Sequence, residues 1–363
     1  MGVWSRIVRK EFAAATNAQI EFVDTTLRYR KSFDLSFVKR YVAGAAQALR
    51  DIGRVRRRLK DARPDVLHLC TSGGPASLKD AVVLRLSRRF EVPAVVHYHM
   101  GRLPAVARDR FLEWRFTLRA MRRADAVVTL DARSEAVVKE ALPGRRVLTL
   151  PNMVEVDAVD DVRRQFAGEP VAPAPSVRLV FVGHVLPEKG VRELIAAAAR
   201  LRHRGVRLDI VGPATSRFRD ELHSIADRLG TADWLQFHGG VEHSAAVGRI
   251  LAADVFVLPS YTEGAPMSVL EAMACGKPIV SCPVGAVPEM LDIGGSQECG
   301  ALVPCRDVDA LASTLDDVAS NPAKRQAWGA QARRRVEQHY AAPVACARLL
   351  ETWQSLVNGW RNA

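Results

Sequence analysis

Two glutamates, Glu263 and Glu271, stand eight positions apart in a segment that favours a ligand site. Residues 254–259, just before them, have the apolar pattern of a buried strand. Pro266 fits the first turn of a helix, and Gly276 would end that helix. The free N–H groups at a helix start attract phosphate, and carboxylates accept hydrogen bonds from hydroxyl groups. The segment therefore predicts a site for a diphosphate, a sugar and a ribose.

A second loop carries the cation that a phosphate needs. Residues 177–182 are predicted to form a strand, and a helix is predicted over 191–204. The loop between them contains His184 and Lys189, which can supply positive charge beside aligned N–H donors. For Lys189 taken alone, a solvated loop lysine is the simpler interpretation.

The segment 263–278 resembles the signature E-G-x-P-x-S-x-L-E-A-M-A-x-G-x-P of retaining glycosyltransferases of family 4, also called group 1, which have the GT-B fold. The resemblance implies that Glu263 contacts the donor sugar and takes part in catalysis, and that Glu271 accepts hydrogen bonds from the ribose. Without this motif, two solvated helix-end carboxylates would be the simpler interpretation. The remaining residues that the resemblance assigns to the donor are Gly264, Ala265, Pro266, Met267 and Ser268.

Residues 183–190 resemble the family motif G-R-L-x-x-x-K-G, whose Arg and Lys bind the diphosphate. Gly183 and Lys189 match, but His184 stands at the arginine position, and its charge depends on pH. The resemblance makes Lys189 the group that stabilises the leaving diphosphate, so we expect transfer without a metal or other cofactor. Residues 211–213, which include Gly212, and residues 237–239 are expected at the same sheet edge, where they would line the base pocket.

A histidine is predicted at the end of the strand 94–99. The run H-Y-H-M-G, which ends at Gly101, resembles the family's His-x-His-Gly with Met100 inserted. The resemblance assigns the active-site histidine to His99, facing the interdomain cleft near the donor sugar. His97 shares its sheet face, and a core histidine is the alternative for either residue. Glu289 resembles a residue of another family loop, with a helix cap as the alternative.

Strands alternate with helices along the whole chain, which predicts an α/β protein with doubly wound parallel sheets. The resemblance implies GT-B, two Rossmann-like domains with an interdomain cleft. The domains are predicted at 1–152 and 177–341, with a linker at 153–176 and a helix over 342–358 that crosses back within 342–363. Further strands are predicted at 20–23, 66–70, 126–130, 147–150, 207–211, 235–237 and 279–280. Further helices are predicted at 3–15, 36–61, 76–90, 105–123, 132–141, 216–229, 243–252, 307–319 and 322–338.

The start of the chain departs from the family, whose first strand and Gly-rich loop precede the first helix. Here Met1 and Gly2 stand directly before the helix predicted at 3–15. We hypothesise that the true start lies upstream; a shortened domain is the alternative.

The net charge of +12 is concentrated in one half of the chain. Residues 1–150 contain 30 Lys and Arg against 15 Asp and Glu, whereas the rest contains 22 against 25. This asymmetry points to an anionic partner of the first half, such as a lipid surface, a phosphorylated acceptor or an acidic glycan. Nucleic acid would also suit the charge, but no DNA or RNA motif is present. Four arginines of helix 105–123, which stand beside apolar residues, suit a membrane or a solvated face equally: Arg115, Arg119, Arg122 and Arg123.

The six cysteines lack CxxC pairs, no apolar run is long enough to cross a bilayer and no signal peptide is visible. We therefore expect a cytoplasmic protein, peripheral at the inner membrane face if the basic half binds lipid. The predicted function is retaining, hexosyl-type transfer from a nucleotide-diphosphate sugar to a glycan or lipid-linked acceptor, in envelope polysaccharide or lipid-linked glycan synthesis. A non-catalytic GT-B partner subunit and a nucleotide-sugar epimerase are the alternatives.

Overall fold

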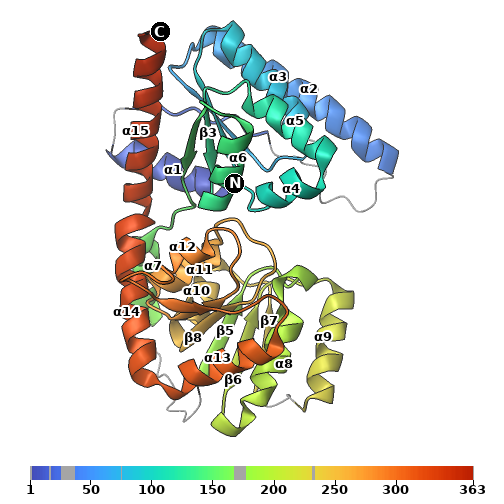
Figure 1. Ribbon diagram of the computed structural model, residues 1–363, viewed down its shortest axis with the longest axis vertical. Helices are drawn as coiled ribbons and strands as arrows, with labels where there is room; N and C mark the ends of the chain where they lie inside the picture. Colours follow the sequence, from blue (N-terminus) through green and yellow to red (C-terminus); the bar gives the residue numbers. More distant parts are fainter. Residues whose placement is uncertain are drawn as a thin grey trace. The chain divides into compact units, whose positions relative to one another are not determined.

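The computed structural model describes residues 2–15, 18–25, 37–74, 76–166, 177–230 and 234–362 (Figure 1). The chain divides into two compact units, and each is described by itself. Unit 1 comprises Met1–Leu150 and Cys346–Ala363, and unit 2 comprises Pro151–Ala345. No helix among the described residues is both long enough and apolar enough to span a bilayer.

Unit 1 is built on a parallel sheet of four strands in the order β1-β2-β3-β4. The strands are β1 (Leu67–Thr71), β2 (Ala94–Tyr98), β3 (Ala126–Thr129) and β4 (Arg146–Thr149). The central strands β2 and β3 are buried throughout, which explains their nearly continuous apolar sequence. The remaining elements are α1 (Gly2–Ala15), α2 (Phe37–Asp61), α3 (Ala76–Arg89), α4 (Leu103–Asp109), α5 (Phe111–Met121), α6 (Ala132–Ala141) and the end of α15 (Ala342–Arg361).

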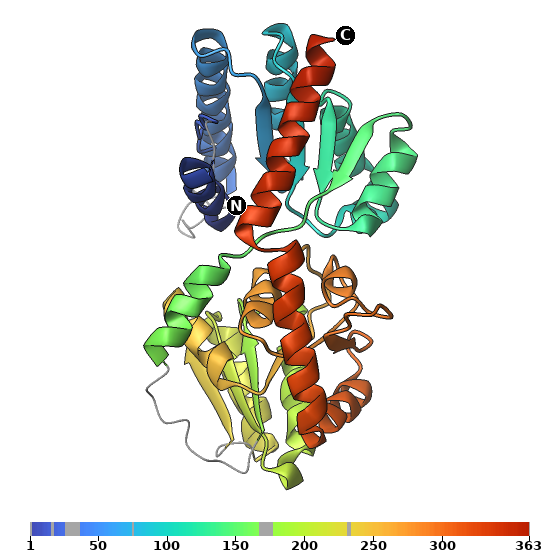
Figure 2. The same cartoon turned by 90° about the vertical axis from the view of Figure 1, so that its left-hand side faces the viewer.

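Helices cover both faces of the unit 1 sheet, as Figure 2 shows. On one face, residues of α2, α3 and α5 pack on Leu69, Val96 and Tyr98 to form the hydrophobic core. On the other face, α1 and α15 contact β1 and β2, where Trp4 and Trp353 meet His68. Side chains that alternate along β1 and β2 therefore divide into an apolar face and a face rich in histidine.

Unit 2 is built on a parallel sheet of six strands in the order β10-β9-β8-β5-β6-β7. The strands are β5 (Arg178–Val182), β6 (Arg207–Val211), β7 (Leu235–Gly239), β8 (Val255–Leu258), β9 (Ile279–Ser281) and β10 (Gly300–Leu302). The helices are α7 (Val156–Phe166), α8 (Val191–Arg200), α9 (Ser216–Arg228), α10 (His243–Ala252), α11 (Met267–Ala274), α12 (Val287–Met290), α13 (Val308–Ser320), α14 (Pro322–His339) and the first residues of α15.

The strand order of unit 2 creates a switch point. The chain runs outward from β5 to β7 and then returns to the other side of β5 to form β8. The loops that leave β5 and β8 at their carboxyl ends therefore diverge in direction and leave a crevice between them. This topology places the loop with Lys189 beside the loop with Glu263.

Three predicted elements differ from the structure. Residues 18–25 form no strand; instead Glu21 pairs with Arg58 of α2, and the carbonyl of Asp24 accepts a hydrogen bond from Arg54. The helix predicted at 105–123 is broken at Arg110 into α4 and α5. The helix predicted at 191–204 ends at Arg200, before a 3-10 turn. β10 and α12, which are only three and four residues long, were not predicted.

The linker predicted at 153–176 is wrong for its first part. Met153 is buried, and α7 buries Val159 and Val162 in unit 2 because its apolar positions lie on one helical face. Arg163 of this helix also donates a hydrogen bond to the carbonyl of Ala274. Residues 167–176 lie outside the described residues.

The last helix runs to Arg361, three residues beyond its predicted end. From Cys346 onward it belongs to unit 1, where Trp353 contacts His68 and Arg361 pairs with Asp65.

Candidate functional site

Lys189 and Glu263 form an ion pair at the switch point of unit 2, with 2.7 Å between Nζ and Oε1. Their side chains are 20% and 11% exposed, so the pair is sheltered but open to a ligand on one side. Glycine is required beside them: Gly190 has φ +68°, and a Cβ there would lie 2.2 Å from the carbonyl oxygen of Pro259. The Tyr261 N–H also donates to the Glu188 carbonyl at 2.9 Å, which ties the two loops together.

The loop that carries Glu263 also contacts the residues that follow a third strand, β9. Gly285, after β9, has φ +52°, and a Cβ there would lie 2.1 Å from the carbonyl oxygen of Gly264. That carbonyl accepts a hydrogen bond from the Ala286 N–H at 2.7 Å. Asn152 donates a side-chain hydrogen bond to the carbonyl of Ala265 at 2.7 Å. Sequence reasoning missed Asn152, because its partner is 113 residues away.

Pro266 is the N-cap of α11, not a residue of its first turn as predicted. Its extended backbone lets its carbonyl accept from the N–H groups of Val269 and Leu270, at 3.2 and 3.4 Å. The first N–H groups of α11, those of Met267 and Ser268, have no acceptor within the helix, as at any helix start. The helix therefore points N–H donors and a positive dipole end toward the edge where Lys189 lies.

Glu271 lies in the second turn of α11 and is largely buried, with its side chain 12% exposed. Its Oε1 is 2.8 Å from Nε2 of His243, the first residue of α10. His243 was not among the predicted site residues. No motif marked it, and only the packing of α10 on α11 brings it to Glu271.

A cavity of about 670 Å³ opens between α9 and the strands β6 and β7, with Val185 of the loop after β5 in its wall. Gly212, which has φ +144°, lies against Gly183: a Cβ at Gly212 would be 1.8 Å from the Gly183 oxygen. His238 Nε2 is 2.6 Å from Oδ1 of Asp209, and both side chains are mostly buried. The predicted segments 211–213 and 237–239 supply these residues of the cavity wall: Gly212, Pro213, Phe237, His238 and Gly239.

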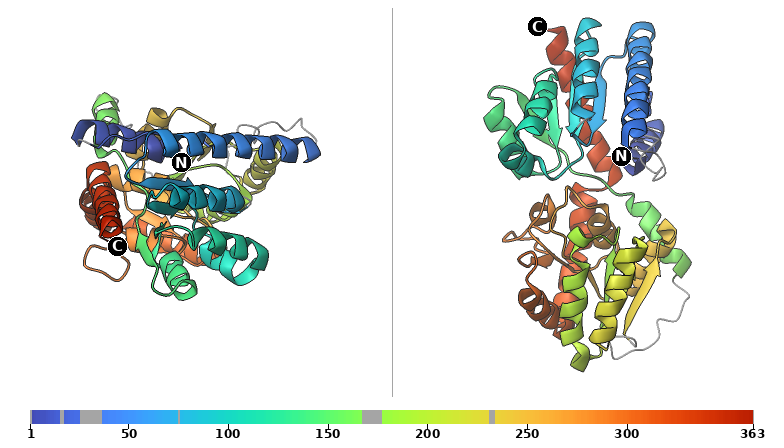
Figure 3. Two further views of the ribbon diagram at one scale, coloured as in Figure 1. Left: turned by 90° about the horizontal axis from the view of Figure 1, so that it is seen from above. Right: turned by 90° about the vertical axis from the view of Figure 1, so that its right-hand side faces the viewer.

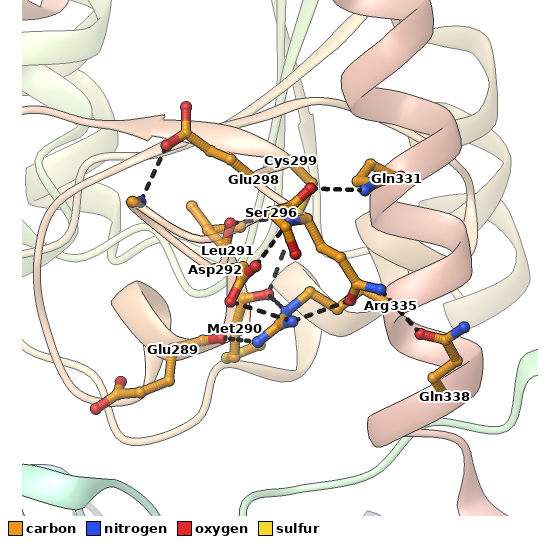
Figure 4. Close-up of polar contacts among 12 residues, drawn as sticks. Glu289, Met290, Leu291, Asp292, Ser296, Glu298, Cys299, Gln331, Arg335 and Gln338 are labelled. Atoms are coloured by element: carbon orange, nitrogen blue, oxygen red, sulfur yellow. Dashed lines mark hydrogen bonds and ion pairs between the residues drawn. The ribbon is translucent and has the colours of Figure 1, made fainter.

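Two other predicted residues of unit 2 lie apart from these contacts. His184 is exposed and makes no hydrogen bond or ion pair with any residue in the described part of the chain. Glu289 lies inside α12 and does not cap it, because Ala286 is the N-cap. Figure 4 shows the Glu289 carboxylate pointing away from Arg335, which donates instead to the carbonyls of Glu289 and Met290, at 2.7 and 2.9 Å.

His99 lies in unit 1, directly after β2, and its N–H donates to the carbonyl of Thr71 at 2.8 Å. The rings of His97 and His99 are 4.0 Å apart between centroids, so both histidines lie on the same sheet face. The indole of Trp4 makes T-shaped contacts with both rings, and its centroid lies 5.6 Å from that of His97 and 5.4 Å from that of His99. His99 is half-buried, whereas His97 is fully buried.

On the histidine face of unit 1, His68 and His97 form a neutral, hydrogen-bonded pair. Trp353 Nε1 donates to His68 Nδ1 at 2.9 Å, so a neutral His68 carries its proton on Nε2, 3.3 Å from Nδ1 of His97. Burial, and then the charge of His99, lowers the pKa of His68 to about 3. The pKa of His97 is also held well below its usual value, by burial and then by His99 and His68.

The same cluster has the residue types of a metal site, because ligand atoms of His68, Cys70 and His97 lie within 4.8 Å of one another. A metal on Nε2 of His68 would require its Nδ1 to carry a proton, yet Nδ1 faces a donor, Trp353. Burial also raises the pKa of the Cys70 thiol to about 12, which disfavours the thiolate. The arrangement therefore fits a structural hydrogen-bonded cluster.

Comparison with known proteins identifies two family models. Residues 163–335 match the model of the glycosyl transferases group 1, and residues 13–153 match a glycosyl transferase 4-like domain. The chain is 31% identical over 317 residues to the 2-deoxystreptamine N-acetyl-D-glucosaminyltransferase of Streptomyces fradiae, covering 78% of this chain and 72% of the relative. It is 28% identical over 287 residues to the alpha-D-kanosaminyltransferase of Streptomyces kanamyceticus, covering 75% and 72%.

Solved structures agree on the fold. The sucrose-phosphate synthase of Thermosynechococcus elongatus superposes with a TM-score of 0.77 at 20% identity, over 98% of this chain and 93% of that one. Anabaena HepE in complex with UDP gives 0.71 at 20% identity, over 84% and 82%. The fold is therefore GT-B, as predicted. Because its sequence matches both models and a relative along most of its length, the chain belongs to the glycosyl transferases group 1 family and is a glycosyltransferase.

Proposed function

We propose that unit 2 binds a nucleotide-diphosphate sugar and that the chain transfers the sugar, with retention of anomeric configuration, to an acceptor hydroxyl. The observation that carries this proposal is the Lys189–Glu263 ion pair at the switch point of the sheet. A lysine ammonium has three donors and uses one on Glu263, which leaves two for phosphate oxygens. The second carboxylate oxygen of Glu263 can accept from a sugar hydroxyl beside that phosphate.

The nucleoside is proposed to lie between α11 and the cavity beside α9. Glu271 would accept from the ribose hydroxyls with one oxygen, while His243 holds the other at 2.8 Å. The base would enter the cavity that Gly212, Phe237 and His238 line. This placement follows the rule that ligands of open α/β sheets bind outside the carboxyl ends of the strands.

The chemistry of transfer requires negative charge to be stabilised on the leaving diphosphate. Lys189 and the free N–H groups at the start of α11 would supply that stabilisation without a metal or other cofactor. His184 would add a donor when a phosphate orders it. His99 of unit 1 is proposed to take part near the donor sugar, and this assignment rests on the family pattern and on its position after β2.

The acceptor is proposed to be a glycan or lipid-linked sugar of the cell envelope, and the location cytoplasmic at the membrane face. The excess of basic residues in the first half of the chain supports an anionic acceptor or surface.

A transfer assay tests the proposal. Purified protein is incubated with UDP-, GDP- and ADP-sugars and a panel of glycan and lipid-linked acceptors, and the product anomer is assigned by NMR. We expect one donor family to give a product with the anomeric configuration of the donor. An inverted product would refute retention, and donor turnover to an isomeric nucleotide sugar without acceptor would establish the epimerase alternative.

A further inference from the structure

The outward face of α3 and α5 exposes large apolar side chains, whereas helices that face water usually expose polar ones. Trp114 and Leu118 of α5 pack on the core, but the opposite side of that helix is also apolar. Between 41% and 69% of each of these residues is exposed: Leu78 and Val82 on α3, and Phe111, Leu112 and Phe116 on α5. Figure 3 shows the two helices side by side on the same face of the unit 1 sheet.

Arginines cover the other half of the same face. Arg85 and Arg88 of α3 and Arg119 of α5 act together on Arg123, whose pKa is lowered first by burial and then by these three charges. Positive charges of both helices are therefore close enough to repel one another. Among the described residues, no carboxylate lies within ion-pair distance of any of these four arginines. An anion that approaches from outside the unit would reduce their mutual repulsion.

Apolar residues come first along both helices and most of the arginines follow them, although Arg115 lies over the Phe111 ring, 5.4 Å from its centroid. On α3, Leu78 and Val82 precede Arg85 and Arg89 at spacings that keep them on one side of the helix. On α5, Leu112 and Phe116 precede Arg119 in the same way. α3 and α5 each connect two parallel strands of the sheet, so both helices run antiparallel to the strands and in the same direction as each other. Their apolar halves therefore lie together, and so do their basic halves.

We propose that the surface formed by α3 and α5 docks on an anionic lipid bilayer. Phe111, Leu112 and Phe116 would enter the boundary between headgroups and acyl chains, and the arginines would contact lipid phosphates. An acidic protein would neutralise the arginines but leave the exposed aromatic side chains without a specific role.

Docking would also orient unit 1. The loop between β1 and α3 leads directly into the apolar half of the surface, and His99, whose N–H bonds Thr71, lies at the same sheet edge. A lipid-linked acceptor would therefore reach this edge from the membrane. Only this last consequence rests on the proposed function; binding to the bilayer stands without it.

Co-sedimentation with vesicles tests the surface without any donor or acceptor. The full chain is mixed with phosphatidylcholine vesicles that contain none or one third phosphatidylglycerol, at low salt and at 0.5 M NaCl. We expect binding to the anionic vesicles only, weakened by salt. Equal binding to neutral vesicles, or none to either, would overturn the proposal and would leave sugar transfer to be judged by its own assay.

Two triple variants and their matched controls locate the binding. Arg85→Gln/Arg88→Gln/Arg119→Gln and Phe111→Ser/Leu112→Ser/Phe116→Ser should each raise the lipid concentration for half-binding by roughly tenfold or more. Arg217→Gln/Arg228→Gln/Arg249→Gln removes the same charge from exposed positions of unit 2, and Val241→Ser/Ile293→Ser removes exposed apolar groups there. These controls should bind as the parent does. An equal loss in the arginine control would show that net charge alone drives binding, and an equal loss in the apolar control would show that exposed apolar groups anywhere suffice; either result would refute the surface.

Discussion

The carboxyl edges of the two sheets are built from different interactions. In unit 2, Lys189 forms a sheltered ion pair with Glu263 on loops whose glycines leave no room for a side chain, and Glu271 of α11 lies 2.8 Å from His243. In unit 1, His68 and His97 beside His99 are neutral, and exposed arginines lie on the outward side of α3 and α5. An edge with paired charges can bind and stabilise anions, whereas a neutral edge can shape a surface for an uncharged hydroxyl.

The largest expected difference between the edges concerns catalysis. Lys189→Ala should lower kcat by about 10²- to 10³-fold, because it removes the cation that would face the leaving diphosphate. Lys324→Ala, which breaks the exposed ion pair with Asp317, is the control and should leave the rate unchanged. Initial rates with saturating donor measure both, and a Lys189→Ala enzyme with the parent rate would remove Lys189 from the mechanism.

The second-largest expected effect is a loss of folding stability when a glycine in the loops of unit 2 gains a side chain. Gly190→Ala should lower the free energy of unfolding by about 2–3 kcal/mol, from a left-handed conformation and a clash with the Pro259 oxygen. Gly144→Ala has a similar φ, +78°, but open space around it, so it should cost only about 1 kcal/mol. Urea unfolding compares the two variants; equal losses would mean that the loop moves away freely.

The neutral histidines of unit 1 predict a dependence on pH. The pKa of His68 is about 3 in the folded chain and 6.5 when unfolded, so only the unfolded chain takes up a proton between these values. The contribution of His68 to stability is therefore complete above pH 6.5 and falls by about 1.4 kcal/mol per pH unit below it.

Unfolding monitored by tryptophan fluorescence between pH 7.5 and 4.5 checks this slope. His68→Asn, whose amide oxygen can still accept from Trp353, should make the acid loss of stability shallower by about that amount. Identical slopes in the parent and the variant would show that His68 is not held neutral.

The smallest effect concerns the residue that supports Glu271. His243→Ala should raise the nucleotide Kd by about three- to tenfold, because Glu271 loses one hydrogen bond but keeps its position. His203→Ala, on an exposed 3-10 turn, is the control for removal of a histidine. Isothermal titration separates them. An unchanged Kd would contradict a supporting role, and a loss equal to that of Glu271→Ala would assign His243 to the ligand itself.

For unit 2, the sequence predicted which residues lie at one sheet edge but not which residues hold them in place. The hydrophobic periodicity and the family motifs placed Lys189 and Glu263 on loops and Glu271 on a helix. These three residues were expected at one sheet edge because parallel strands bring their carboxyl ends together. Gly285, Asn152 and His243 were not recognised as supports, since their partners are 21 to 113 residues away and no local pattern encodes such contacts. The short elements β10 and α12 were missed because three or four residues carry too little periodicity.

In unit 1, the sequence predicted the strands but not the environment of its histidines. The alternation of side chains placed His97 and His99 on one face, but the position of the proton on His68 is set by Trp353, 285 residues away. The strand predicted at 20–23 failed because tertiary contacts with α2 overrode its β propensity. The sequence left the basic helix at 105–123 equally compatible with water or lipid, and it did not show that Phe111 is exposed whereas Trp114 packs on the core.

A thermal-shift measurement with UDP, GDP, ADP and CMP, on the parent and on Glu271→Ala, decides whether the edge of unit 2 is a nucleotide site. We predict that one nucleotide raises the Tm of the parent and that the shift is lost in Glu271→Ala, because only the folded site binds the ligand. No shift with any nucleotide, or an equal shift in the variant, would contradict the assignment of the donor site to Glu271 and its neighbours.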